Sequence, residues 1–356
     1  MSRFTPKCLP VLIGSLPHRE HQEAVELIFA QTPDIPLWPQ LPCHKEEGML
    51  LQFLPGMPGI TNRQDKIFVD TSTPGFEAEL LAFFEEYIGV EEGIIELESS
   101  RFKMSPAEAA GFFAFLSEAA GRVDSLVALK GQVTGPITFC TGLVDQDGRA
   151  LFYDEQIRDT AIKLLSLKAR YQTRMMAQVK PQPLVFFDEP GLAGFGSSAF
   201  ITITPEDIHN CFSEVFAGVK AEGGLTGVHV CANTEWPIIF DSDVDIVSFD
   251  AYSYFDKLML FPDQLRAFLL RGGILASGIV PTSPEYIELE NSSSLVDKWY
   301  EQLVQLEDIG IARAFVFEQT LITPSCGTGT VTLEQAERVL RLTREVSQTI
   351  RQGFES

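Results

Sequence analysis

Three residues in the second half of the chain are suited to holding one transition-metal ion. His229 and Cys231 stand two positions apart in the apolar segment GVHVCAN, and residues two apart in an extended strand point to the same side. Cys326 follows another strand-like run, in the glycine-rich segment TPSCGTGT. Zinc prefers nitrogen and sulfur ligands, and three protein ligands with one open position are typical of a catalytic zinc site. A packed histidine and buried thiols are the alternative interpretation.

Further polar residues follow other strand-like runs, namely Gly14, Ser15, Asp188 and Asp250. In a (β/α)8 barrel the carboxyl ends of all strands meet at one mouth, where the active site lies. We therefore expect these residues to converge on the metal candidates. Asp188 precedes a Glu-Pro pair and could instead initiate a turn, and Asp250 could pair with a neighbouring cation. Glu235 is an alternative oxygen ligand.

The elements that must position these residues alternate between strand-like and helical patterns, as in parallel βα units. Several strand-like runs are almost continuously apolar, which is typical of strands covered on both faces. The expected strands lie at 9–16, 35–41, 125–135, 183–190, 225–232, 244–252, 272–281 and 313–320. The expected helices around them lie at 20–31, 155–178, 205–221, 256–271, 293–309 and 332–352.

Eight strands with intervening helices predict an α/β fold, a (β/α)8 TIM-type barrel formed by residues 1–356 as a single domain. The surplus length lies at 43–124, between the second and third strands, and is expected to form an insertion with two helices at 75–88 and 106–121. A doubly wound open sheet is the alternative, but the sequence has neither a G-x-G-x-x-G turn nor a phosphate-binding loop.

Composition narrows the class of protein and its partners. The 356 residues are 45% hydrophobic and 21% charged, with a net charge of −22. Such a chain is expected to repel nucleic acid, which proteins bind with clustered Lys and Arg. We find no apolar run of membrane-spanning length and no signal-peptide pattern, and we expect a cytoplasmic enzyme. Its six cysteines are expected to be reduced thiols or metal ligands.

Six short segments follow one another in a fixed order along nearly the whole chain. They are IGSLP (13–17), KGQVTGPITF (130–139), FFDEP (186–190), GVHVCAN (227–233), IVSFDAY (246–252) and TPSCGTG (323–329). Together they resemble the catalytic domain of cobalamin-independent methionine synthase and its zinc-dependent relatives in the uroporphyrinogen decarboxylase-like barrel group. The arginine-rich motif of the decarboxylases themselves is missing.

The resemblance implies an activity and a metal. Zinc would be bound by His229, Cys231 and Cys326, and Asp250 stands where the family has a further glutamate ligand. A zinc-bound thiol is deprotonated at neutral pH, and the thiolate is the nucleophile. The implied reaction is methyl transfer to a small thiol, in the first place homocysteine to give methionine. Coenzyme M or another thiol would use the same chemistry.

The resemblance also implies how the thiol is held and casts doubt on folate as donor. Asp188 would bind the amino group of an amino-acid thiol, while Ser15 and the backbone near Gly14 would receive its carboxylate. Folate-using enzymes have a second barrel, an aromatic residue after TGPIT and a proton-donating histidine near ASGIVPTS, all lacking here. A methylcorrinoid, free or on a carrier protein, fits better, because its leaving group needs no proton.

Two functions of other classes remain open at this stage. A metal-free barrel enzyme, such as a decarboxylase, would have a basic pocket and no zinc. A non-catalytic zinc protein that docks a corrinoid carrier would have a closed site with four ligands and no access for a thiol.

Overall fold

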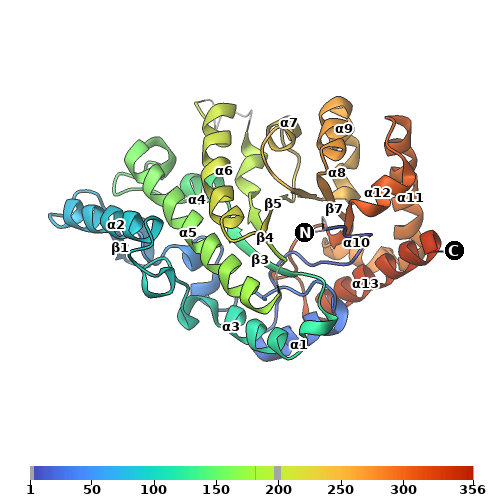
Figure 1. The fold of residues 1–356 in the computed structure, drawn as a ribbon, viewed down its shortest axis with the longest axis horizontal. Helices are drawn as coiled ribbons and strands as arrows, with labels where there is room; N and C mark the ends of the chain where they lie inside the picture. Colours follow the sequence, from blue (N-terminus) through green and yellow to red (C-terminus); the bar gives the residue numbers. More distant parts are fainter. Residues whose placement is uncertain (1–3, 181, 196–201, 356) are drawn as a thin grey trace.

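A curled parallel sheet lies at the centre of the protein and is flanked by helices (Figure 1). The computed structural model describes residues 4–180, 182–195 and 202–355. Within them the sheet has the strand order β3-β4-β5-β6-β7-β8. The strands are β3 (Leu129–Thr134), β4 (Pro183–Asp188), β5 (Leu225–Val230), β6 (Ile246–Phe249), β7 (Ile274–Val280) and β8 (Thr320–Pro324). All strand pairs are parallel, as the alternating pattern predicts.

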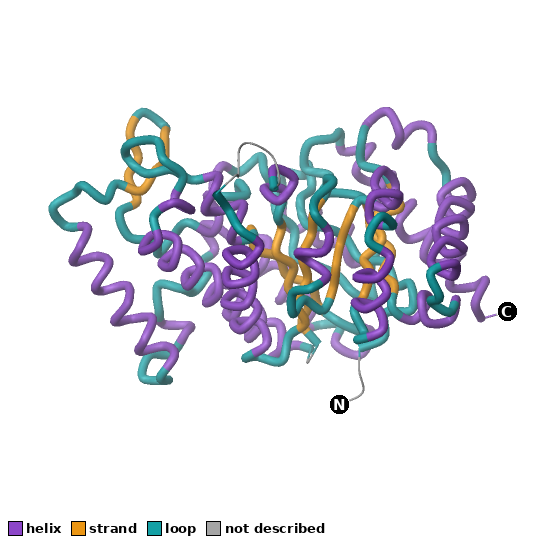
Figure 2. The backbone as a smooth tube through the Cα atoms, turned by 90° about the horizontal axis from the view of Figure 1, so that it is seen from above, coloured by secondary structure: helices purple, strands orange, loops and turns teal. Residues whose placement is uncertain are grey.

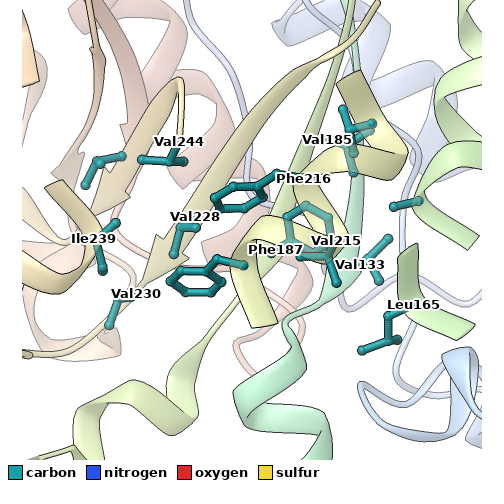
Figure 3. Close-up of a cluster of buried hydrophobic side chains, with 14 of the residues drawn as sticks. Val133, Leu165, Val185, Phe187, Val215, Phe216, Val228, Val230, Ile239 and Val244 are labelled. Atoms are coloured by element: carbon teal, nitrogen blue, oxygen red, sulfur yellow. The ribbon is translucent and has the colours of Figure 1, made fainter. Parts of the chain in front are cut away.

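Apolar side chains pack on both faces of this sheet, because helices cover the outside while the strands curl around an inner core. On the outer face Phe187 of β4 packs against Phe216, with ring centroids 5.7 Å apart. The outer cluster shown in Figure 3 includes Val133, Leu165, Val185, Val215, Val228, Val230, Ile239 and Val244. The inner cluster comprises Leu9, Val11, Ile35, Ala128, Leu184, Phe186, Ile246, Ile274, Ala276 and Leu321.

The helices follow the strands in sequence, as expected for βα units. They are α1 (His21–Gln31), α4 (Pro136–Gly142), α5 (Glu155–Val179), α6 (Pro205–Lys220), α7 (Trp236–Phe240), α8 (Ala251–Leu258), α9 (Pro262–Leu270), α10 (Pro284–Leu289), α11 (Ser292–Asp308), α12 (Arg313–Glu318) and α13 (Leu333–Glu355). The predicted helix at 256–271 is two helices, because Pro262 begins α9 as its first residue and disfavours a helical residue before it.

The first two predicted strands, 9–16 and 35–41, are not regular strands in the structure. They form isolated parallel bridges, which place 9–16 beside β8 and 35–41 beside β3, the two edge strands of the sheet. These segments contain three prolines, and proline has no backbone N–H to donate to a strand ladder. The regular sheet in the described chain therefore has six strands rather than the predicted eight.

The last strand of the sheet begins later in the chain than the predicted range 313–320. Residues Arg313–Glu318 form α12, and β8 begins only at Thr320. Short apolar runs do not distinguish a strand from a buried helical turn by periodicity, and the apolar run AFVF is such a case. The carboxyl end of β8 therefore lies close to Cys326 in the sequence.

Residues 43–124 contain the two predicted helices and a hairpin that the sequence analysis missed. The elements are η1 (Lys45–Glu47), η2 (Leu51–Phe53), β1 (Ile60–Arg63), β2 (Lys66–Val69), α2 (Phe76–Glu91), η3 (Leu97–Ser99), α3 (Pro106–Ala120) and η4 (Val123–Ser125). The two hairpin-turn residues, Gln64 and Asp65, have positive φ, as two-residue hairpin turns require. In Figures 1 and 2, β1 and α2 lie at the end of the molecule opposite the C-terminus.

None of the helices in the described residues combines the length and the apolar character needed to cross a membrane.

Candidate metal centre

The three predicted metal ligands come together at the carboxyl ends of two strands. His229 belongs to β5 and Cys231 follows it directly, while Cys326 lies just after β8. Their ligand atoms all lie within 4.8 Å of one another, a grouping found for these three residues in the described chain. In a tetrahedral site with Zn–S bonds of ~2.3 Å, two sulfur ligands lie about 3.8 Å apart. The spacing of the three side chains therefore fits zinc.

One ring nitrogen of His229 has a hydrogen-bond partner, and the other has none among the described residues. Nδ1 lies 2.9 Å from Oγ of Ser248 on β6. Nε2 is buried and finds no hydrogen-bond partner among the residues that the structure describes. Buried polar atoms are normally paired, so an orphaned ring nitrogen beside two thiols is an observation that a bound ion would explain. The donor set of one imidazole and two thiols is the one that zinc prefers.

The two thiols influence each other strongly. Contacts with Cys326 and His229 lower the pKa of Cys231 to about 4. The interaction with Cys231, followed by burial, raises the pKa of Cys326 above its ordinary value. Cys231 is therefore the more acidic thiol of the pair. A divalent cation would let both thiols ionise, since metal ligation requires the thiolate form.

A cavity of about 310 Å³ opens directly onto these ligands. Its wall includes His229, Cys231 and Cys326 together with Asp188 and Ser15, so the structure brings five of the predicted site residues to one space. The other lining residues are Ile13, Gln40, Pro42, Glu47, Met49, Thr134, Pro190, Gly327, Gly329 and Thr330. This volume suits a small ligand.

Asp188 occupies the end of β4, beside the metal candidates. It is the register partner of His229, and its Oδ1 is buried with no hydrogen-bond partner in the described part of the chain. Burial raises the pKa of its carboxyl group, and the charges of His229 and Lys130 oppose that rise. Lys130 lies deeper inside, where its Nζ is 3.3 Å from Oε1 of Gln132. Asp188 also lines the cavity, where a carboxylate is suited to accept hydrogen bonds from a ligand.

Ser15 is hydrogen-bonded to the loop that carries Cys326. Its Oγ accepts a hydrogen bond from the backbone N–H of Gly329 at 3.2 Å, and its carbonyl accepts one from Thr328 N–H at 2.8 Å. Gly14 is fully packed as well, because a Cβ at this position would approach Gln40 Oε1 to 2.8 Å. In the structure both residues therefore support the cavity wall.

Asp250 and Glu235, the predicted oxygen ligands, lie outside the group of three. Oδ1 of Asp250 accepts a hydrogen bond from Ser253 N–H at 2.8 Å and thereby caps α8. Glu235 is exposed at the start of α7. Asp250 is near enough that the charges of Cys231 and His229 affect its pKa, which burial raises overall. The role of Asp250 as a ligand stays a prediction.

The structure joins two motifs that the sequence analysis treated separately. Glu189 of the FFDEP segment is fully buried, and its carboxylate accepts hydrogen bonds from Ile137 N–H at 2.9 Å and from Thr138 N–H at 2.7 Å. The Thr138 hydroxyl adds a third at 2.6 Å. A Cβ at Gly135 would collide with the Glu189 side chain. Glu189 therefore caps the N-terminus of α4 and ties this helix to the end of β4, where Asp188 lies.

The sequence analysis also missed the cavity residues that the insertion supplies. Glu47 is buried, and its carboxylate bonds His21 at 2.5 Å and the backbone N–H of Leu41 at 2.7 Å. Met49 lies in the same segment and accepts a hydrogen bond at its carbonyl from Thr134 Oγ1 at 2.5 Å. The one available signal was their position directly after the 35–41 segment, whose carboxyl end reaches the mouth.

Comparison with known proteins supports the predicted class of fold. No family model matches the sequence, and curated protein sequences give no match either. Among solved structures, the fold is similar to that of a methionine synthase and to that of a methyltransferase, as the sequence motifs predict.

Two of those structures match almost end to end. One is a B12-independent methionine synthase from Shewanella sp. W3-18-1 in complex with selenomethionine, with a TM-score of 0.59 and 15% identity over 98% of this chain and 99% of that chain. The other is a methyltransferase from Methanosarcina mazei, with a TM-score of 0.53 and 14% identity over 98% of this chain and 95% of that one. At such identities the likeness is one of fold.

Proposed function

We propose that the protein is a zinc-dependent methyltransferase that transfers a methyl group to a small thiol, in the first place homocysteine to give methionine. The observation that carries the proposal is the grouping of His229, Cys231 and Cys326 at the wall of a cavity. The fold supports it, since it is similar to that of a methionine synthase and a methyltransferase. We also propose that residues 1–356 form one cytoplasmic (β/α)8 barrel domain, with segments 9–16 and 35–41 closing the barrel and 43–124 inserted in it.

Zinc bound at His229, Cys231 and Cys326 would act as a Lewis acid that lowers the pKa of an incoming thiol. The chain's own residues orient that thiol. Asp188, whose Oδ1 has no hydrogen-bond partner among the described residues, would accept a hydrogen bond from the ammonium group of the thiol. The backbone around Ser15 would face its carboxylate. Positioning of this kind supplies a large part of the rate enhancement in two-substrate reactions.

A methylcorrinoid is the proposed donor in preference to methyltetrahydrofolate. Among the described residues that line the cavity, one is a histidine, His229. We assign it to the metal. The wall then offers no second imidazole to protonate a folate leaving group. The similar Shewanella enzyme is B12-independent, so the donor has to be tested directly by supplying each compound to the purified protein.

The cavity supports methyl transfer better than the two other classes. A decarboxylase acting on a carboxylated ligand calls for a basic pocket, but the cavity wall contains no Lys or Arg among the described residues. A purely structural zinc protein calls for a closed site, whereas here Cys231 and Cys326 are only partly buried at an open cavity. Coenzyme M has no amino group for Asp188 to bind, so the proposed role of Asp188 favours an amino-acid thiol.

The decisive experiment is elemental analysis of the purified protein and of the variants His229→Ala and Cys326→Ser. We expect about one zinc per chain in the wild type and a loss in both variants. Cys43→Ser is the matched control, because Cys43 is an exposed thiol away from the ligand group. A wild type that binds no zinc after reduction and reloading contradicts the proposed mechanism.

A further inference from the structure

A hydrogen bond from the next strand determines which nitrogen of His229 is available. Nδ1 of His229 lies 2.9 Å from Oγ of Ser248, and the two residues are register partners on β5 and β6. Nε2 is left buried and without a partner among the described residues. We propose that Ser248 is a positioning residue that holds the His229 ring with Nε2 directed to the metal ion. The inference rests on the proposed function, since it requires an ion at this site.

The chemistry of imidazole explains why this hydroxyl matters. A neutral imidazole has one N–H and one lone pair, and a metal ligand needs its lone pair on the ligating nitrogen. If Nε2 of His229 ligates, the proton lies on Nδ1 and is donated to Ser248 Oγ, which accepts it. Partners of this kind fix the tautomer and orientation of metal-bound histidines, and their removal typically weakens metal affinity about 10–100-fold.

The surroundings of Ser248 favour this role. Its side chain is fully buried, so bulk water does not compete for Nδ1. Asp250 lies just after β6, and its Oδ1 accepts the backbone N–H of Ser253 at the start of α8. Within β6 itself, the group that bonds His229 is the Ser248 hydroxyl.

The test measures zinc affinity by competition with a chromophoric chelator, in the full-length protein. Ser248→Ala removes the acceptor and is expected to weaken zinc binding about 10–100-fold. Ser248→Thr keeps a hydroxyl on the same carbon and is expected to stay close to the wild type. Ser277→Ala is the matched control, because Ser277 is a buried serine on the adjacent strand β7 near Trp299, away from the cavity lining.

A second readout separates positioning from a loss of structure. The protein loaded with cobalt(II) reports ligand geometry through its visible absorption, and we expect a changed spectrum in Ser248→Ala only. Thermal unfolding of the metal-free variants checks that all of them are folded. A Ser248→Ala affinity within about threefold of the wild type, or an equal loss in Ser277→Ala, overturns the inference. If the wild type itself binds no zinc, the proposed function fails together with it.

Discussion

Asp188 and His229 are register partners at the carboxyl ends of β4 and β5. In the same register, Thr134 of β3 lies beside Asp188, and Ser248 of β6 lies beside His229. Neighbouring strands lie about 4.8 Å apart, so a ligand group held at Asp188 is one strand away from the metal candidates. A substrate that contacts both must carry its ammonium group within a few bonds of its sulfur atom, as homocysteine does.

Replacement of Asp188 by Asn should act on recognition of the amino group. We expect the KM for homocysteine to rise about 10–100-fold, because a hydrogen bond to a charged group contributes roughly 1.5–3 kcal/mol. The comparison substrate is 4-mercaptobutyrate, which has the same length but no amino group. Its kinetics should be almost the same with both proteins. An equal loss for the two thiols would assign Asp188 to another task.

Zinc binding should release protons, because the pKa of Cys326 is raised by Cys231 and by burial. At pH 7 we expect on the order of one proton per zinc from this thiol. Isothermal titration in buffers of different ionisation enthalpy measures this number. A heat that is independent of the buffer would show that both thiols are already ionised, against the coupling described above.

The conservative change Asp250→Asn separates a helix cap from a metal ligand. Asparagine caps helices about as well as aspartate, whereas alanine there costs about 1 kcal/mol. Because Asp250 bonds Ser253 N–H, we expect Asp250→Asn to keep its zinc and its stability, and Asp250→Ala to lose stability alone. A clear drop in zinc affinity with Asp250→Asn would instead identify its carboxylate as a fourth ligand.

The close packing between Ser15 and the Cys326 loop makes a specific double-variant prediction. A Cβ at Gly327 would lie 2.2 Å from Ser15 Oγ, so Gly327→Ala should displace the loop and destabilise the protein by about 1–3 kcal/mol. Adding Ser15→Ala removes the clashing atom and should restore part of that loss. Gly75→Ala is the control, since its nearest atom is 4.0 Å away. Denaturant unfolding of the three variants measures the effect, and simple additivity would argue against this contact.

Glu189 should make stability depend on pH. Burial raises the pKa of its carboxyl group from 4.5 to about 7, although hydrogen bonds from Thr138 and Ile137 oppose the shift. A carboxyl group with a raised pKa in the folded state contributes stability that is present below pH 4.5 and is lost as the pH rises through 7. We expect Glu189→Gln to reduce this decline between pH 5 and 8, while Glu85→Gln, an exposed control on α2, leaves it intact. Unfolding free energies at both pH values provide the measurement.

Local patterns in the sequence predicted which residues come together at the candidate metal centre. The spacing of His229 and Cys231 fixes their common side once the segment is a strand, and Cys326 follows the final strand even though that strand begins later than expected. The parallel strands β3 to β7 could be predicted because their apolar runs are continuous.

What the sequence could not reveal depends on contacts between distant segments. Asp250 has the residue type of a ligand, and its carboxylate also caps α8 by accepting Ser253 N–H, a contact that the sequence does not reveal. The hydrogen bond between Glu189 and Thr138 joins residues that are 51 positions apart. Glu47 lines the cavity from the insertion, and its position after the 35–41 segment is the one feature of the sequence that indicates this.

The hydrogen bond between Ser15 and Gly329 joins positions 314 residues apart. A growing polypeptide leaves the ribosome from its N-terminus, and domains fold as units during synthesis. His229 and Cys231 therefore emerge well before Cys326, which arrives together with the loop that Ser15 anchors. Incomplete chains would offer only two of the three proposed ligands, so the proposed zinc site could form only after Cys326 has been synthesised.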